Sequence, residues 1–344
     1  MTPSLKPLAE QVILITGASS GIGLATARRA AAAGAKVMLV ARSGDALAEI
    51  VRGIEAAGGS AAFAVADVGA AEALAAAAAA AVARFGRIDT WVNNAGVAIY
   101  SALLDTPDDE HERLFRTNYW GLVNGCRIAV EHLRRNGGAL VTVGSIAAEM
   151  PSPVLGAYTA SKHAAKGYVD SLRIELQAAG LPIAVSLVKP SGVATPIAQH
   201  AANHQAHGAK VPPPAYRPEL VADAILDCAV TGRREVTVGG AGRAMTLFAA
   251  HFPGAFDRLA PLVVPLLSSR SVPKTPSALF APGGSGEERS RFEPAKPFSL
   301  YTALRMRPWL AGALMAGGIG AAAALARRRA RGEGRADPFA HRLA

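Results

Sequence analysis

Three residues with complementary chemistry lie within one short stretch of the chain. Tyr158 and Lys162 are four positions apart, and Ser145 precedes the tyrosine by thirteen. Residues i and i+4 share one face of a helix, so the lysine ammonium is expected beside the phenol. A neighbouring cation favours the phenolate and lowers the pKa of a tyrosine from its usual value of about 10. We therefore predict a tyrosine acid/base, with a serine hydroxyl beside the same substrate oxygen.

A tyrosine and a lysine at this spacing more often serve packing and solubility, so the prediction depends on the rest of the chain. Val12 to Thr16 is an apolar run typical of a strand buried on both faces, and a helical pattern follows its glycine-rich turn. This order lets backbone N–H groups and a helix N-terminus approach a pyrophosphate. The predicted nucleotide-binding residues of the turn are Gly17, Ser19, Ser20, Gly21, Ile22 and Gly23.

The ends of the next two strands predict adenosine contacts. Residues 36–41 form the second predicted strand, and Arg42 follows it with a guanidinium that can take a 2′-phosphate. An alanine stands where NAD-preferring proteins carry an acid, so we predict NADP(H), with NAD(H) as the less favoured alternative. The third strand, residues 61–66, ends at Asp67 and Val68, where a carboxylate can reach the adenine amino group.

Small and amide residues follow the fourth predicted strand, residues 90–92. Asn94, Ala95 and Gly96 suit a close backbone approach to a ligand in the crevice of the sheet. The next predicted helix runs from about residue 108 to residue 135 and contains Asn118. By itself, a mid-helix asparagine is usually a surface or hydrogen-bonded residue.

Taken together, these motifs resemble the single-domain short-chain dehydrogenases/reductases. The residues that carry the resemblance are T-G-A-S-S-G-I-G from Thr16, N-N-A-G from Asn93, Asn118, Ser145 and Y-T-A-S-K from Tyr158. The resemblance implies that Tyr158 is the general acid/base and that Lys162 lowers its pKa and binds the nicotinamide ribose. It also implies that Ser145 orients the substrate oxygen and that Asn118 holds a water in a proton relay.

The resemblance covers residues 6–195 strongly and continues less specifically to residue 240. It implies further cofactor contacts after the sixth strand, residues 185–188, and a seventh strand at residues 235–238. These contacts are Pro190, Val193 and Thr195. Ser191 stands where the family usually has glycine, which leaves the backbone path there open. We expect an α/β, Rossmann-like, doubly wound parallel sheet of about seven strands with helices on both faces.

The charge of the chain divides it into parts. Of the net charge of +10, residues 268–344 contribute +8, from 13 Lys/Arg and 5 Asp/Glu. No nucleic-acid-binding motif accompanies this basicity, so no nucleic-acid partner is expected. We predict a catalytic domain at residues 1–267 with its core at 8–240, a flexible linker at 268–300, and a basic tail at 301–344. Two cysteines and no apolar leader predict a cytoplasmic, non-secreted catalytic domain.

The tail contains eighteen uncharged residues, 309–326, with arginines on both sides. Eighteen helical residues span about 27 Å, enough for a thin bilayer core, so a membrane-spanning helix is the first interpretation. A helix docked on protein and a disordered segment are the alternatives. His200, His204 and His207 share one helical face of the predicted lid, residues 196–218, but further ligands are lacking and no metal is predicted.

The sequence therefore predicts an NADP(H)-dependent oxidoreductase acting on a carbonyl/alcohol pair. The apolar lid and tail indicate a lipophilic small-molecule substrate. One alternative is an NAD-dependent alcohol dehydrogenase, and another, from a different class, is a nucleotide-binding membrane-associated scaffold. The resemblance alone implies a homodimer or homotetramer.

Overall fold

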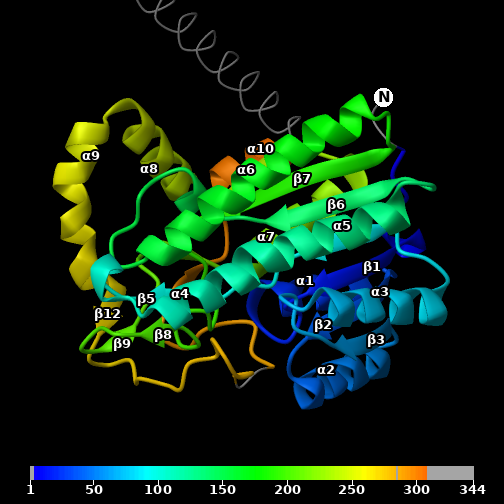
Figure 1. Cartoon of the computed structure of the whole chain (residues 1–344), viewed down its shortest axis with the longest axis horizontal. Coiled ribbons are helices and arrows are strands. Elements are labelled where there is room, and N and C mark those ends of the chain that lie inside the picture. The colour runs from blue at the N-terminus through cyan, green and yellow to red at the C-terminus, as the bar shows by residue number, and fades with distance from the viewer. Residues whose placement is uncertain (1–3, 284–285, 308–344) are drawn as a thin grey trace, which may run out of the picture.

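The computed structural model describes residues 4–283 and 286–307. At its centre lies a seven-stranded parallel sheet in the order β11-β7-β6-β4-β1-β2-β3 (Figure 1). Its strands are β1 (Val12–Thr16), β2 (Lys36–Ala41), β3 (Ser60–Val65), β4 (Thr90–Asn93), β6 (Gly138–Val143), β7 (Ile183–Pro190) and β11 (Glu235–Val238). The predicted doubly wound α/β fold is confirmed.

Helices cover both faces of this sheet. The first seven are α1 (Gly21–Ala32), α2 (Gly44–Ala56), α3 (Ala71–Phe85), α4 (Asp108–Phe115), α5 (Gly121–Leu133), α6 (Gly156–Ala178) and α7 (Pro218–Thr231). Apolar side chains of α1, α2 and α7 form one core cluster, and those of α3, α5 and α6 form the other. The sheet is therefore buried on both faces, as its unbroken apolar strands require.

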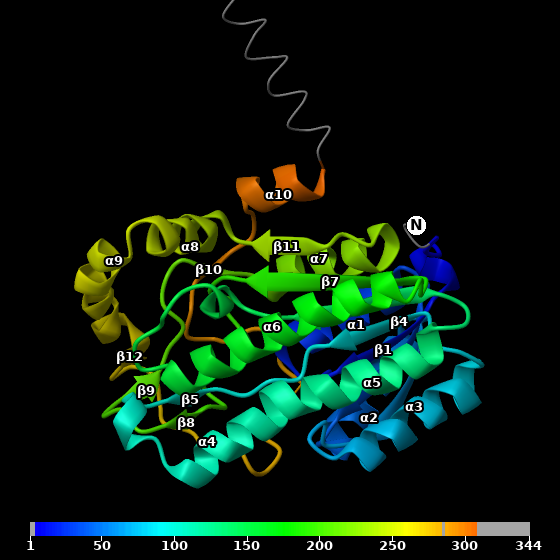
Figure 2. The same cartoon turned by 45° about the horizontal axis from the view of Figure 1, so that its top comes forward.

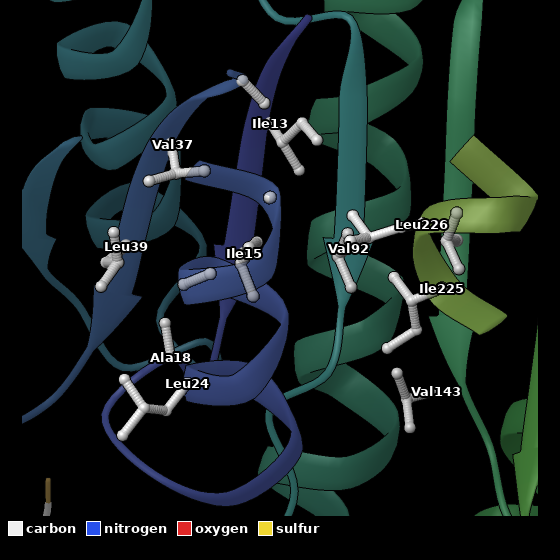
Figure 3. Close-up of a cluster of buried hydrophobic side chains, with 14 of the residues drawn as sticks. Ile13, Ile15, Ala18, Leu24, Val37, Leu39, Val92, Val143, Ile225 and Leu226 are labelled. Carbon is white, nitrogen blue, oxygen red and sulfur yellow. The ribbon is translucent and has the colours of Figure 1, made fainter. Parts of the chain in front are cut away.

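Each central strand contributes side chains to both core clusters, because successive side chains point to opposite faces of the sheet. Ile13 and Ile15 point into the cluster with α1 and α7 (Figure 3), whereas Leu14 belongs to the other. All three are fully buried. Burial of one such side chain stabilises the fold by about 1.5–3 kcal/mol, so these strands form a rigid base for the loops at their ends.

The strand order reverses between β1 and β4, the first and fourth strands of the sheet in the chain. After β1 the chain moves outward through β2 and β3, and then crosses back so that β4 pairs with the other side of β1. Such a switch point leaves a crevice at the carboxyl ends of the strands, where ligands bind in open α/β sheets. The motifs singled out above all follow those carboxyl ends.

Short elements complete the described fold. They are β5 (Ile99–Tyr100), β8 (Ala202–Asn203), β9 (Gly208–Ala209), β10 (Ala215–Tyr216), α8 (Gly240–His251), α9 (Pro253–Leu259), a 3₁₀ helix (Ala260–Leu267), β12 (Ser268–Ser269), β13 (Ala295–Lys296) and α10 (Leu300–Met306). Those that line the crevice include β5, α8 and the 3₁₀ helix after α9. In Figure 2 the arrows of β7 and β11 point toward the side occupied by α8 and α9.

The range 268–300, which the sequence predicts as a linker, lies along the catalytic domain. Its two short strands pair with the lid, β12 with β9 and β13 with β10. The predicted span 309–326 lies outside the described residues. Among the helices that the structure describes, none has the length and apolar character needed to cross a membrane.

Candidate active site

A cavity of about 450 Å³ lies at the carboxyl ends of the strands. Three of the four predicted catalytic residues, Ser145, Tyr158 and Lys162, contribute to its wall. The predicted cofactor residues that line it are Gly17, Ser19, Ser20, Gly21, Ile22, Arg42, Asp67, Val68, Asn94, Ala95, Gly96, Pro190, Val193 and Thr195. Two predicted residues, Asn118 and Gly23, lie behind this wall.

The glycine-rich turn between β1 and α1 is shaped for close backbone approach. Gly17 has a φ of +65°, and a Cβ on it would lie 2.7 Å from the Cα of Ala95. A Cβ on Gly23 would lie 2.2 Å from the carbonyl oxygen of Gly17, so Gly23 supports the turn from below. The Asn94 side chain fixes the turn by donating to the Thr16 carbonyl at 2.9 Å. This cradle at the N-terminus of α1 fits a pyrophosphate.

At the end of β2, Arg42 is held by a later part of the chain. Residues 277–283 and 286–290, here called the C-terminal strap, run beside the cavity. The guanidinium of Arg42 donates to four strap carbonyls, those of Ala278, Leu279, Phe280 and Ala281. Burial and then the neighbouring guanidinium of Arg113 lower the pKa of Arg42, although Asp67 opposes them.

Asp67 does not stand free to meet an adenine ring. It forms an ion pair with Arg113 of α4 and accepts a hydrogen bond from the Gly69 N–H at 2.9 Å. Burial alone would raise its pKa, but these hydrogen bonds outweigh burial and hold the pKa below its ordinary value. Arg113 carries no motif signal in the sequence, and only the packing of α4 brings it to this end of the cavity.

At the other end of the cavity, α6 carries Tyr158 and Lys162 one turn apart. The Lys162 ammonium lies 5.6 Å from the centroid of the Tyr158 ring and donates to the carbonyl of Val143 at 3.1 Å. Ser145 caps a 3₁₀ turn that follows β6, with its hydroxyl accepting from the Ala147 N–H at 3.1 Å. The end of β6 thus holds both the serine and the carbonyl that orients the lysine.

The expected lowering of the tyrosine pKa is wrong. Burial raises the pKa of Tyr158 above its usual value, and a hydrogen bond with Ser145 opposes that rise only in part. Burial also lowers the pKa of Lys162 to about 8. The physical reason is desolvation, which disfavours the charged form of both groups.

Asn118 lies in a π-helical turn, Arg116–Trp120, between α4 and α5. Its side chain accepts from the Val97 N–H at 2.9 Å and donates to the Val97 carbonyl at 3.0 Å and to the Ser161 hydroxyl at 3.1 Å. The asparagine is therefore a buried clamp between the loop after β4 and α6. π-Turns of this kind occur frequently at functional sites.

The three lid histidines do not share a helical face. His204 pairs with Glu110 of α4 at 2.8 Å, His207 contacts Arg270 at 3.4 Å, and His200 lines the cavity. The lid instead forms β8, β9 and β10, so the helical spacing was misleading. No group of three or more His, Cys, Asp or Glu side chains arranged to hold a metal occurs among the described residues.

Serine replaces the usual glycine at position 191 without breaking β7's pairing. The Ser191 N–H donates to the Val238 carbonyl at 2.9 Å, and the Gly192 carbonyl accepts from the Tyr216 N–H at 2.8 Å. The Ser191 side chain fits because it faces Gly239, where a Cβ would lie 2.0 Å from the serine hydroxyl oxygen. The backbone path left open by the sequence is therefore hydrogen-bonded to β11 and the lid.

Three features are together typical of a nicotinamide-dependent oxidoreductase of Rossmann type. They are the topology of the sheet, the glycine-rich turn and the cluster of a serine, a tyrosine and a lysine. Residues 11–206 match the short chain dehydrogenase family, and the chain belongs to it. It is 38% identical over 330 residues to the uncharacterized oxidoreductase YxnA of Bacillus subtilis, covering 93% of this chain and 92% of the relative. It is 34% identical over 191 residues to a 3beta-hydroxysteroid dehydrogenase of Mediterraneibacter gnavus, covering 55% of this chain and 68% of that protein.

Two solved structures are similar to this one. A short chain dehydrogenase/reductase from Burkholderia phymatum, in complex with NAD, is 25% identical with a TM-score of 0.66, over 73% of this chain and 96% of that chain. An alcohol dehydrogenase from Thermococcus sibiricus, complexed with 5-hydroxy-NADP, is 26% identical with a TM-score of 0.58, over 66% and 95%. Both NAD-type and NADP-type ligands thus occur among its structural neighbours.

Proposed function

We propose that this protein is an NADP(H)-dependent oxidoreductase that interconverts a carbonyl and an alcohol on a lipophilic small molecule. The observation that carries the reaction type is the cluster of Ser145, Tyr158 and Lys162 on one cavity with the glycine-rich turn. When bound, the nicotinamide cofactor supplies or accepts the hydride. The residues of this chain then have only to bind the substrate, orient it and move one proton.

Each residue of the cluster has a physical task. Tyr158 gives its phenolic proton to the substrate oxygen during reduction and takes one during oxidation. Ser145 holds that oxygen, because its hydroxyl lies on the tyrosine side of the cavity. Lys162 supplies a positive charge, and its low pKa of about 8 allows that charge to change near working pH.

The balance of charges around Arg42 supports NADP(H). Two guanidiniums, of Arg42 and Arg113, meet a single carboxylate, Asp67. The surplus positive charge favours an anion such as the 2′-phosphate. The residues of the cavity also fit a dinucleotide, because Gly17 lines it and lets the turn lie directly against Ala95, where a Cβ would come within 2.7 Å of the Ala95 Cα.

The alternative is an NAD-dependent alcohol dehydrogenase, and one observation favours it: strap carbonyls already bind Arg42. Titration of the purified protein with NADPH and with NADH, followed by nicotinamide fluorescence, separates the two. We expect tight NADPH and weak NADH binding, with the preference reversed in Arg42→Asp. Tighter NADH binding by the wild type would support the alternative. A scaffold without catalysis predicts no turnover with either cofactor.

The substrate half of the cavity supports a lipophilic substrate. It is lined by apolar side chains from the 3₁₀ turn, the lid, α8 and the following 3₁₀ helix, namely Ile146, Met150, Val211, Met245, Val263 and Leu266. Burial of an apolar ligand against such a wall stabilises the complex in proportion to area. Screening of steroid, retinoid and fatty carbonyls with NADPH tests this, and a strict preference for small polar carbonyls would refute it.

Two further parts of the proposal concern assembly. Membrane association through residues 309–326 is inferred from their eighteen uncharged residues flanked by arginines. Exposed apolar side chains of the described residues, including Phe252 and Leu262, would add to contact with lipid. Flotation of the full chain with anionic lipid vesicles tests it, and an entirely unbound protein would contradict it.

A homodimer or homotetramer is proposed from the family resemblance, and light scattering of the full chain measures it.

A further inference from the structure

The C-terminal strap is attached to the domain at both ends of its path along the cavity. The Ala278 N–H donates to the His200 carbonyl of the lid at 2.8 Å. At the glycine-rich turn, the Gly286 N–H donates to the Ser19 carbonyl and the Gly21 N–H donates to the Glu287 carbonyl, both at 2.9 Å. Between these points the strap meets Arg42.

The carbonyls of the strap use every terminal donor of the Arg42 guanidinium. A guanidinium has four N–H groups on its two terminal nitrogens. Nη1 donates to the carbonyls of Leu279 at 3.1 Å and Phe280 at 3.3 Å, and Nη2 donates to those of Ala278 and Ala281. A guanidinium bonded in this way has no terminal N–H left for another acceptor.

A 2′-phosphate at this position needs those same donors. Charge-assisted hydrogen bonds to a phosphate are roughly twice as strong as bonds to a neutral carbonyl, so the phosphate is the preferred partner. Arg113 strengthens that preference, because its Nε also donates to the Leu279 carbonyl at 3.0 Å. Among the described residues, Asp67 is the carboxylate that pairs with Arg113. Exchange of carbonyls for phosphate therefore satisfies both the donors and the surplus charge.

We propose that strap residues 278–281 and the 2′-phosphate of NADP(H) compete for the terminal N–H groups of Arg42. NADP(H) binding then releases these residues from the arginine, whereas NAD(H), which lacks the phosphate, leaves them bound. The strap is in this way a cofactor-specificity element supplied by the C-terminal extension. The inference rests on the proposed NADP(H) function, and it makes Arg42 an anchor of the strap as well as a phosphate ligand.

The release is confined to the part of the strap beside Arg42, because other anchors lie elsewhere. Glu288 pairs with Arg28 of α1 at 2.6 Å, and Arg289 pairs with Glu219 of α7. Neither pair involves the residues around the 2′-phosphate position. Weakening them should loosen the strap as a whole and so weaken its carbonyls as competitors for Arg42.

Hydrogen–deuterium exchange of the full chain tests the competition at the N–H groups of Ala278 and Leu279. The ligands are 2′,5′-ADP, which carries the 2′-phosphate without a nicotinamide, and 5′-AMP as its matched control, followed by NADP⁺ and NAD⁺. These N–H groups donate to the His200 carbonyl and the Ser277 hydroxyl, so their exchange reports local opening of the strap. In the wild type, loss of the charged hydrogen bonds to the strap carbonyls should destabilise this local structure, and we expect exchange at residues 278–279 to become about tenfold faster with 2′,5′-ADP and NADP⁺. With 5′-AMP and NAD⁺, the exchange should stay unchanged.

Two arginine deletions make the test specific. In Arg42→Ala, exchange at these residues should already be fast without ligand and should not respond to 2′,5′-ADP. Arg134→Ala removes an arginine at the opposite end of the sheet, where it pairs with Glu131, and should behave like wild type. Unchanged or slower exchange in a wild-type protein saturated with 2′,5′-ADP would overturn the proposal.

Failure of the proposed cofactor preference has a different signature. If the wild type turns over NADH only and binds no 2′-phosphate compound, the NADP(H) function fails. The competition is then judged in a Glu288→Ala/Arg289→Ala double variant, whose strap anchors are weaker. Gain of 2′,5′-ADP binding there, by about twofold to fivefold or more from loss of surface ion pairs, supports the competition. Continued absence of binding overturns it.

Discussion

Replacement of Lys162 by methionine should stabilise the cofactor-free protein. Burial lowers the pKa of Lys162 from 10.5 to about 8. Each pKa unit corresponds to about 1.4 kcal/mol, so holding the ammonium in the folded state costs about 3 kcal/mol at pH 7. Loss of the hydrogen bond to the Val143 carbonyl offsets about 1 kcal/mol of this gain. The expected net gain of Lys162→Met is about 2 kcal/mol, accompanied by loss of turnover.

The sign of the pH dependence follows from proton binding. Between the folded pKa of about 8 and the ordinary value of 10.5, the unfolded chain holds the lysine proton and the folded chain does not. Wild-type stability therefore rises with pH through this window, and the penalty falls from about 3 kcal/mol at pH 7 to about 1.4 kcal/mol at pH 9.5. The advantage of Lys162→Met should shrink by the same amount.

Urea unfolding without cofactor at pH 7.0 and pH 9.5 measures both quantities. Lys166→Met is the matched control: it lies one turn further along α6 and pairs with Asp170 at the surface, so its removal should change stability by about 1 kcal/mol or less. A Lys162→Met protein that is less stable than wild type at pH 7.0, or whose advantage grows at pH 9.5, would refute the desolvation argument.

Further substitutions test the turn and the clamp. Gly23→Ala should abolish cofactor binding and lower the melting temperature, because its Cβ would lie 2.2 Å from the Gly17 carbonyl oxygen. Gly53→Ala in α2 is the control: a Cβ there meets nothing within 4 Å, so this variant should stabilise the helix by about 0.5–1 kcal/mol. Equal melting temperatures for the two variants would contradict this. Asn118→Ala should lower the free energy of unfolding in urea by about 1–3 kcal/mol and lower kcat, because Val97 and Ser161 lose their hydrogen-bond partner. An unchanged free energy of unfolding would contradict the role of Asn118 as a stabilising clamp.

Where the local pattern and the tertiary environment agree, the sequence was a sufficient guide. Val12–Thr16 and Lys36–Ala41 have the bounds read from their apolar runs, and Glu235–Val238 has the bounds that the family resemblance implied. The reason is that strands buried on both faces consist mainly of apolar residues, so an unbroken apolar run in the sequence indicates such a strand. The same holds for the glycine-rich turn, since a φ of +65° at Gly17 excludes most other residues.

The parts that eluded sequence reasoning are those held by backbone or by distant elements. The C-terminal strap is rich in proline, glycine and serine and reads as a linker, yet its carbonyls bind Arg42. Carbonyl acceptors leave no side-chain signature. Arg113 looks like a surface residue of α4, and only the fold brings it to Asp67. The raised pKa of Tyr158 depends on burial, which the spacing of a tyrosine and a lysine does not report.

The central claim is that Tyr158 transfers the proton in a nicotinamide-dependent carbonyl/alcohol reaction. The most direct measurement compares turnover of Tyr158→Phe and wild type on the same carbonyl substrate, with cofactor affinity measured in parallel. Phenylalanine keeps the ring that lines the cavity but removes the phenolic hydroxyl that passes the proton. We predict near-normal cofactor affinity and a kcat lowered by about 10²-fold or more. Full turnover by a Tyr158→Phe protein that binds cofactor normally would contradict the mechanism.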